Sequence, residues 1–287
     1  MQVVKALDAA EWLRRAGPLL LADEARHNLV LGLAGTLRDQ PELYPEHELW
    51  LVEDGGAVVG AALRTPPYRL VLAQPAADEA LEALAAALDD LPGVVAAVPE
   101  SRDFADAWRA KTGVRVEQGF AQGVYKLERV VPPRPASGSS RPAREADREL
   151  LLEWLHAFSI EALHEENPAR GHLERMVAQR LGPQLDSGFV LWEDGGEAVS
   201  ATAFGSSTPN GSRIGPVYTP PERRGHGYAS ALVAEVSQAR LDAGKRFCFL
   251  YTDLANPTSN KIYVDLGYER VCDSVELDFL AGASEDP

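Results

Sequence analysis

The stretch that decides the fold is residues 214–229, which read IGPVYTPPERRGHGYA. The run from Arg213 to Thr219 is expected to be a strand that follows a turn at Pro209-Asn210-Gly211. From Tyr228 to Ala243 the sequence favours a helix, and Gly244 supplies the left-handed residue that commonly follows one. We therefore expect a strand, a tight glycine-containing loop and a helix start in direct succession.

The loop in this stretch has the features of an anion site. Gly225 and Gly227 let its backbone approach a ligand closely, because no Cβ intervenes and unusual dihedral angles cost little. Its N–H groups would converge at the positive end of the helix that begins near Tyr228, a geometry that suits a pyrophosphate. Arg223 and Arg224 add positive charge beside it.

Two familiar phosphate motifs are excluded. No Gly-Lys-Ser or Gly-Lys-Thr follows the loop, so it is not a Walker loop. Ser230 stands three residues after Gly227, where the dinucleotide fingerprint requires a third glycine. A purely structural turn remains the alternative interpretation of this Gly-x-Gly sequence.

The second half alternates between helix and strand patterns, which predicts an α/β fold with helices on both faces of a sheet. Helices are expected at 145–162, 169–181, 228–243 and 258–266, and strands at 189–192, 198–206, 213–219, 247–252 and within 268–279.

The first half repeats this order. Residues 50–61 read WLVEDGGAVVGA and resemble VLWEDGGEAVSA at 190–201, an offset of 140 residues, and Asp-Gly between two such runs is a strong hairpin signal. A helix at 76–91, a strand at 94–98 and a helix at 104–112 then follow as in the second half. We favour a tandem duplication over a common turn that occurs twice by chance.

A proline-rich segment separates the halves. Residues 131–143 read VPPRPASGSSRPA, and four prolines with Gly and Ser cannot build a helix or a central strand. The segment is expected to be a linker between domains at 1–130 and 144–287.

Two segments make the second half similar to the GNAT superfamily of N-acetyltransferases. That family carries Gln/Arg-x-x-Gly-x-Gly/Ala at a strand-to-helix junction, and residues 222–227, ERRGHG, match both glycines but place Glu222 first. Residues 256–268, NPTSNKIYVDLGY, resemble the family's Asn-x-x-(small)-x-x-x-Tyr-x-x-x-Gly-(Phe/Tyr) segment. The resemblance implies two tandem GNAT-like domains, each a mixed twisted sheet flanked by helices, of which the first is degenerate.

The resemblance also implies a reaction. Acetyl-CoA would be the co-substrate, and a primary amine of a small molecule or peptide would attack its thioester directly. Tyr263 would protonate the departing thiolate, Asn256 would contact the pantetheine arm or the chain near it, and a backbone N–H at Val217 or a neighbour would stabilise the carbonyl oxygen. The cofactor-binding residues expected are Val217, Tyr218, Arg223, Arg224, Gly225, His226 (through its backbone), Gly227, Tyr228, Ala229 and Asn256.

A general base is expected where the first helix of the second half ends. Glu161, His164, Glu165 and Glu166 lie there, and Glu165 is the candidate chosen. Each of these has a solvated surface charge as its alternative role. For Tyr263 the alternative is a packed core tyrosine whose hydroxyl is hydrogen-bonded.

The first half has no matching Gly-x-Gly loop after its strand at 68–72. Pro75 removes one N–H donor, and Asp78 and Glu79 place negative charge where a phosphate would lie. This half is expected to bind no coenzyme A and to be structural or to wall the acceptor pocket.

Bulk composition limits the partners. The 287 residues include 43 acidic and 28 basic ones, for a formal net charge of −15, so neither nucleic acid nor an anionic membrane is expected as a partner. Cys248 and Cys272 are expected to be buried and reduced, and no metal-ligand spacing is present. Without a secretory signal or a long apolar stretch, a cytoplasmic monomer or homodimer is expected.

Two other interpretations stay open. A non-catalytic acyl-CoA-binding or regulatory module would bind coenzyme A but acetylate no amine. An unrelated α/β binding protein, whose loop is only a turn, would show no affinity for coenzyme A.

Overall fold

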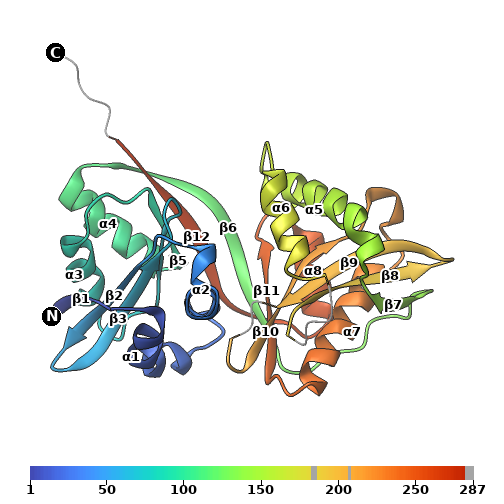
Figure 1. Ribbon diagram of the computed structural model, residues 1–287, viewed down its shortest axis with the longest axis horizontal. Helices are drawn as coiled ribbons and strands as arrows, with labels where there is room; N and C mark the ends of the chain where they lie inside the picture. The colour runs from blue at the N-terminus through green and yellow to red at the C-terminus, as the bar shows by residue number, and fades with distance from the viewer. Residues whose placement is uncertain (182–185, 206–207, 282–287) are drawn as a thin grey trace, which may run out of the picture. The chain divides into compact units, whose positions relative to one another are not determined.

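The computed structural model describes residues 1–181, 186–205 and 208–281, and the chain forms two compact units (Figure 1). The first unit holds residues 1–124 together with the chain from Val271 onward. The second holds residues 125–270. Both are mixed α/β structures built in the same order of elements, as the internal repeat predicts.

The second unit is a mixed sheet with helices on both faces, and its strands lie in the order β7-β8-β9-β10-β11-β6. Helices α5 and α6 cover one face through a cluster that includes Leu155 and Leu191. Helices α7 and α8 cover the other through Leu232 and Leu250. The elements are β7 (Ser139–Pro142), α5 (Arg148–Leu163), α6 (Arg170–Ala178), β8 (Gly188–Asp194), β9 (Glu197–Gly205), β10 (Gly211–Tyr218), α7 (Tyr228–Asp242), β11 (Phe247–Asp253), α8 (Pro257–Asp265) and β6 (Arg115–Leu127).

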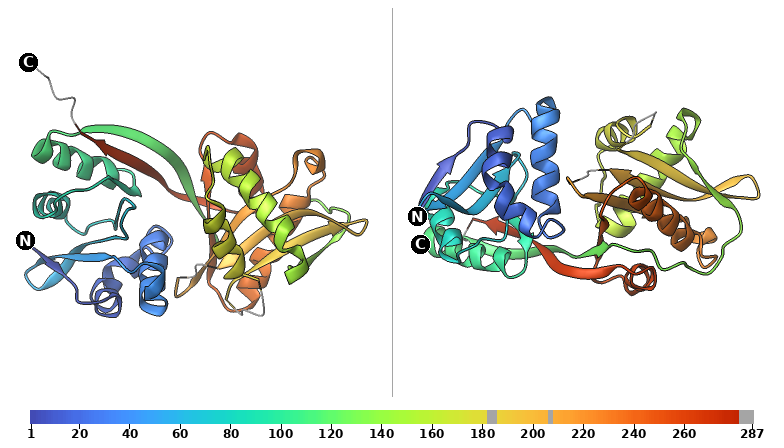
Figure 2. Two further views of the ribbon diagram at one scale, coloured as in Figure 1. Left: turned by 45° about the horizontal axis from the view of Figure 1, so that its top comes forward. Right: turned by 90° about the horizontal axis from the view of Figure 1, so that it is seen from below.

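The first unit repeats this plan with strand order β1-β2-β3-β4-β5-β12. Helices α1 and α2 cover one face through Trp12 and Leu51, and α3 and α4 cover the other through Leu84 and Val94 (Figure 2). The elements are β1 (Gln2–Lys5), α1 (Ala9–Ala22), α2 (Asn28–Asp39), β2 (Glu48–Asp54), β3 (Ala57–Arg64), β4 (Leu70–Leu72), α3 (Glu79–Ala87), β5 (Gly93–Ala97), α4 (Glu100–Thr112) and β12 (Glu269–Leu280).

The predicted hairpins are present in both units and share their details. Strands β2 and β8 begin and end 140 residues apart, and so do the starts of β3 and β9. The register shifts at Glu53 in one hairpin and at Glu193 in the other. The turn glycines have positive φ in both, 55° and 86° at Gly55-Gly56 and 61° and 85° at Gly195-Gly196. This agreement of irregular features supports duplication over chance.

The last strand of each repeat completes the sheet of the other unit. Strand β12 pairs antiparallel with β5, from Ser274 opposite Ala97 to Asp278 opposite Gly93. The end of β6 belongs to the second unit, where β6 lies beside β11. The compact units therefore differ from the linker-based domains 1–130 and 144–287, because order along the chain does not reveal which sheet a strand joins.

The linker expected at 131–143 ends earlier in the structure, at β7. This strand pairs antiparallel with β8 at the edge of the sheet, from Ser139 opposite Glu193 to Pro142 opposite Val190. An edge strand tolerates proline because the ladder needs donors on one side only. Arg141 fixes it further, with ion pairs of 2.6 Å to both Asp147 and Glu193.

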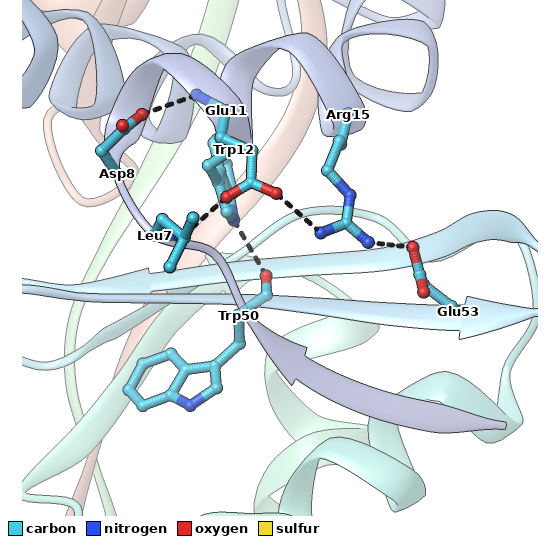
Figure 3. Close-up of polar contacts among 7 residues, drawn as sticks. All are labelled: Leu7, Asp8, Glu11, Trp12, Arg15, Trp50 and Glu53. Carbon is cyan, nitrogen blue, oxygen red and sulfur yellow. Dashed lines mark hydrogen bonds and ion pairs between the residues drawn. The ribbon is translucent and has the colours of Figure 1, made fainter.

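Helix α1 of the first unit is anchored on β2 by polar contacts (Figure 3). Asp8 caps the helix by accepting from the Glu11 N–H at 2.8 Å. The buried Trp12 indole donates to the Trp50 carbonyl at 2.9 Å. Arg15 contacts both Glu11 and the bulge residue Glu53. The same bulge position, Glu193 in the second unit, is held by an edge strand instead.

Both cysteines are buried and free, as predicted. Burial raises the pKa of Cys248 to about 12 and that of Cys272 to about 11, so neither is a ready thiolate. Among the described ranges, no helix has both the length and the apolar character that a membrane crossing requires.

Candidate functional site

The loop between β10 and α7 has the predicted form. A short 3-10 turn at Pro221–Arg223 follows β10, and residues 221–227 are exposed up to the start of α7 at Tyr228. Gly225 and Gly227 both have φ of 83°, a left-handed conformation that glycine adopts without steric cost. Gly227 is the residue before the helix, and no side chain caps the helix there.

The loop presents a row of unused backbone donors. Within the described residues, the N–H groups of residues 225–230 donate no hydrogen bond, and the first helical bond runs from Ala231 N to Gly227 O at 3.0 Å. The backbone N–H groups of Arg223 and Arg224 instead donate to the Pro220 and Pro221 carbonyls, at 2.9 and 3.3 Å. Consecutive free N–H groups at a helix N-terminus are suited to a phosphate or pyrophosphate.

The two arginines beside the loop are paired with carboxylates. Arg223 contacts Glu197, and Arg224 lies 2.6 Å from Glu161 while its Nε donates to the Thr219 carbonyl at 2.8 Å. Their positive charge is thus partly neutralised, and the backbone supplies the donors that remain for an anion.

Tyr228 and His226 brace the loop. The buried Tyr228 donates its hydroxyl to Asp194 at 2.5 Å, and Ser137 donates to the same carboxylate oxygen at 2.6 Å. The His226 ring stacks on Tyr228 with centroids 5.4 Å apart. Both side chains are thus engaged by the protein, which leaves the backbone of these residues for a ligand.

Strands β10 and β11 separate beside this loop. They pair in parallel only from Gly211 opposite Phe247 to Arg213 opposite Phe249, although β10 continues to Tyr218 and β11 to Asp253. The register of β10 with β9 also shifts between Ile214 and Val217. The facing edges beyond Arg213 therefore hold no mutual ladder, and an extended amide chain can occupy such edges.

The irregularity of β10 was not anticipated from the sequence. Gly215 and Pro216 lie inside the register shift, and Gly215 has a φ of 127°. A glycine and a proline inside a strand are the sequence signal for a bulge, so it could have been predicted. Because Pro216 has no N–H, it cannot itself donate to a carbonyl oxygen there.

Tyr263 is buried in α8 without a hydrogen-bond partner for its hydroxyl. Its ring is 8% exposed and lies edge-on to Tyr268 at 5.9 Å, and burial raises its pKa to about 12. In the described part of the chain, no atom bonds its hydroxyl, whereas the Tyr268 hydroxyl lies 2.8 Å from Ser237 Oγ. The Tyr263 hydroxyl is not among the fully buried polar atoms that lack a partner, so it keeps some solvent access, whereas the Tyr268 hydroxyl is a paired core group.

Asn256 is the N-cap of α8, and its Oδ1 accepts from the Ser259 N–H at 3.1 Å. Its expected contact with the pantetheine arm stays a prediction. Asn260 donates to the Asp253 carbonyl at 3.2 Å, and its buried Oδ1 has no partner among the described residues. Asn260 therefore has an acceptor available near the end of β11.

The base candidates lie in three different settings. Glu161 accepts from the Tyr218 hydroxyl at 3.0 Å; burial opposes its ionisation, but Arg224 and Tyr218 outweigh burial and lower its pKa. His164 Nε2 lies 3.3 Å from Asp253 Oδ2 at the end of β11. Glu165 and Glu166 are exposed. The structure thus brings Glu161 and His164 to β10 and β11, and the role of Glu165 stays a prediction.

No group of three or more potential metal-binding side chains occurs in residues 1–181, 186–205 and 208–281. The site is therefore described by its backbone donors, Tyr263 and the nearby carboxylates.

Comparison with known proteins identifies the second half. Residues 148–268 match the model of the GNAT acetyltransferase family. No curated protein matches the chain. A GCN5-related N-acetyltransferase from Sphaerobacter thermophilus is 17% identical over 98% of this chain and 96% of that one, with a TM-score of 0.61. A tandem GNAT protein from the clavulanic acid biosynthesis pathway is 15% identical over 99% of both chains, with a TM-score of 0.55.

A Drosophila protein has the same fold, with 12% identity over 97% of this chain and 98% of that one and a TM-score of 0.68. At these identities the structures establish the fold, a tandem GNAT arrangement. Residues 148–268 form a domain of the GNAT acetyltransferase family, which supports acyl transfer from an acyl-CoA.

Proposed function

We propose that the second unit transfers an acetyl group from acetyl-CoA to a primary amine. The observation that carries the proposal is the row of unbonded N–H groups at residues 225–230, beside the point where β10 and β11 separate. The loop would hold the pyrophosphate, and the unpaired strand edges would hold the amide-containing pantetheine arm. The thioester would then lie between β10 and α8.

The proposed reaction is a direct transfer. The neutral amine attacks the thioester carbonyl carbon, the C–S bond breaks, and the amine proton passes to a base. A backbone N–H at Val217 or Gly215 stabilises the charge that develops on the carbonyl oxygen. Tyr263 gives its proton to the sulfur, a role supported by its unpaired hydroxyl.

The base is proposed to be Glu165 or one of its neighbours at the end of α5. Glu161 favours the ionised form, and His164 is oriented by Asp253. Each would act directly or through a water, since exposed groups at this end can reach a bound amine by one relay.

A non-catalytic acyl-CoA-binding module is the second candidate, because the free N–H groups by themselves predict binding and not turnover. A cytoplasmic location and the monomeric or dimeric state stay predictions from the sequence.

Calorimetric titration with acetyl-CoA tests the proposal. We expect one molecule bound per chain, and loss of binding in the double variant Gly225→Asp/Gly227→Asp, because each aspartate adds charge and a Cβ at a φ of 83°. The matched control is Gly55→Asp/Gly56→Asp in the first unit, where φ is 55° and 86° and a Cβ meets open space. Absence of binding by the folded wild-type protein would overturn both candidates.

A further inference from the structure

Two arginines lie together on the α5 and α6 face of the second unit's sheet. Arg213 stands in β10 between Ser212 and Ile214, which are fully buried, and Ile214 packs in the α7 cluster. Because side chains alternate along a strand, Arg213 faces α5 and α6. Its guanidinium carbon lies 5.1 Å from the centre of the Tyr251 ring on β11. Arg180 follows α6, and the charge of Arg213 contributes to lowering its pKa.

Neither arginine is paired with a carboxylate in the residues that the structure describes. The half-buried side chain of Arg213 makes no hydrogen bond or ion pair there, and burial lowers its pKa. Arg180 donates to the Met176 carbonyl at 3.2 Å, its Nε is buried without a partner, and burial together with the Arg213 charge lowers its pKa. Of the segments outside the described residues, 182–185 and 206–207 contain no acidic residue, and 282–287 contain Glu285 and Asp286.

Such a pair is costly unless an anion joins it. Burying a cation without a counter-charge is unfavourable, and two adjacent guanidinium groups add mutual repulsion. The chain is not short of partners, because it has 43 acidic residues, and it places two carboxylates around Arg141 in the same unit. An external anion would offset this cost.

The pair adjoins the proposed reaction centre. Arg213 is the last β10 residue paired with β11 before the strands separate. Tyr251 precedes Asp253 by two residues, so both face the same side, roughly 7 Å apart along the strand. Asp253 orients His164, and Glu161 accepts from Tyr218 on this same side. Arg213 thus lies at one end of the face, and two carboxylates, of which Glu161 also pairs with Arg224, lie at the other.

We propose that the acceptor of this domain is an amine that also carries a carboxylate, which Arg213 and Arg180 bind. The carboxylates of Glu161 and Asp253 attract the amino end, and the guanidinium fork of Arg213 matches a carboxylate geometrically. This inference rests on the proposed acetyl transfer and specifies its substrate class.

The test compares acceptors that differ only in the carboxylate. Acetyl transfer is measured for β-alanine, 4-aminobutyrate and 6-aminohexanoate, each beside the alkylamine of equal chain length. We expect the wild-type protein to prefer an amino acid of one of these lengths. In the Arg213→Met variant, kcat/KM for that amino acid should fall about 10- to 100-fold because KM rises. The kcat/KM for the alkylamine should change by no more than about twofold.

Arg240→Met is the matched control. Arg240 lies in α7 of the same unit with its guanidinium carbon 4.2 Å from the centre of the Phe204 ring, so the same change removes a similar arginine–ring contact away from β10 and β11. This variant should keep the preference for the amino acid. Acetyl-CoA affinity should be unchanged in both variants.

Two further results separate the possible failures. Equal activity of the wild-type protein on amino acids and alkylamines, with acetyl-CoA bound, would overturn the inference alone, whereas absence of acetyl-CoA binding would overturn the proposed function. If the Arg213→Met variant does not fold, inhibition of the wild-type protein tests the inference instead. Butyrate should compete with the amine acceptor, and butyramide should not. Equal inhibition by both would overturn the inference.

Discussion

The two units have the same topology but use the amides after their fourth strand differently. In the second unit the N–H groups of residues 225–230 remain unbonded. In the first unit Ala73 N bonds Ala61 O at 2.9 Å, Gln74 N bonds the His27 ring at 3.0 Å, and Ala76 N bonds Val59 O at 2.8 Å. The second unit leaves these donors unbonded, and the first bonds those of Ala73, Gln74 and Ala76 internally.

His27 makes much of this difference. It precedes α2 in the first unit, whereas the residue before α6 in the second is the exposed Ala169. The buried His27 ring contacts Leu20 O through Nδ1 at 2.9 Å, so its Nε2 accepts from the Gln74 N–H. The comparison teaches that the hairpins and helices define the fold, while a few loop residues decide whether the backbone N–H groups after the fourth strand stay unbonded.

The largest expected effect concerns the chemistry of the second unit. Tyr263→Phe should lower kcat for acetyl transfer about 100-fold or more, because it removes the proposed proton donor to the sulfur. Acetyl-CoA affinity, measured by calorimetry, should not change. Tyr268→Phe is the control, since its hydroxyl is already paired with Ser237, and it should reduce stability while kcat is retained. If the Tyr263→Phe variant turned over as fast as the wild-type protein, Tyr263 would be a packed core tyrosine and not the proton donor.

A smaller effect on acetyl-CoA binding should follow when the helix after the loop of the second unit receives an acidic residue in its first turn, as the first unit has. Ser230→Glu places an acid in the first turn of α7, as Glu79 does in α3. Acetyl-CoA binding should weaken about 10-fold through repulsion of the pyrophosphate. The free energy of unfolding should rise slightly, because an acid favours a helix N-terminus. Weaker binding together with lower stability would instead indicate damage to the fold.

The third prediction concerns pH and the first unit. Burial lowers the His27 pKa below its ordinary 6.5, reinforced by Arg26 and opposed by the Leu20 carbonyl, Asp23 and Glu100. The unfolded chain therefore takes up a proton before the folded one, so the His27 contribution to stability is full at neutral pH and is lost as the pH falls below 6.5. Urea unfolding should show a loss of up to about 1.4 kcal/mol per pH unit there. His27→Gln should remove that slope; an unchanged slope would contradict the assignment.

The smallest effect is expected at the two hairpin bulges. Glu53→Gln loosens the contact with Arg15 shown in Figure 3 and should cost about 1 kcal/mol or less. Glu193→Gln should cost no more, since Arg141 keeps its bidentate contact with Asp147. Both are read from chemical denaturation. A large loss at either position would show that the bulges themselves depend on the pair.

Much of the site was predictable because it is local in sequence. The strand, the two glycines and the helix start lie within residues 214–229, and glycine at a left-handed position acts wherever the chain folds. The hairpins were predictable for the same reason, since Asp-Gly-Gly fixes a turn through neighbours alone. The bulge at Gly215 and Pro216 had a sequence signal that was not used.

Other features depend on residues far apart in the chain. The sequence alone determined the two repeats, the loop that keeps free N–H groups and the second half's likeness to acetyltransferases. Only the tertiary structure decided that β12 joins the sheet of the first unit and the end of β6 that of the second. It also decided that, within the described residues, the Tyr263 hydroxyl has no partner while that of Tyr268 has one, and that Arg213 and Arg180 have no carboxylate partner. The physical reason is that strand pairing and charge pairing are settled by neighbours in space, which a local pattern does not encode.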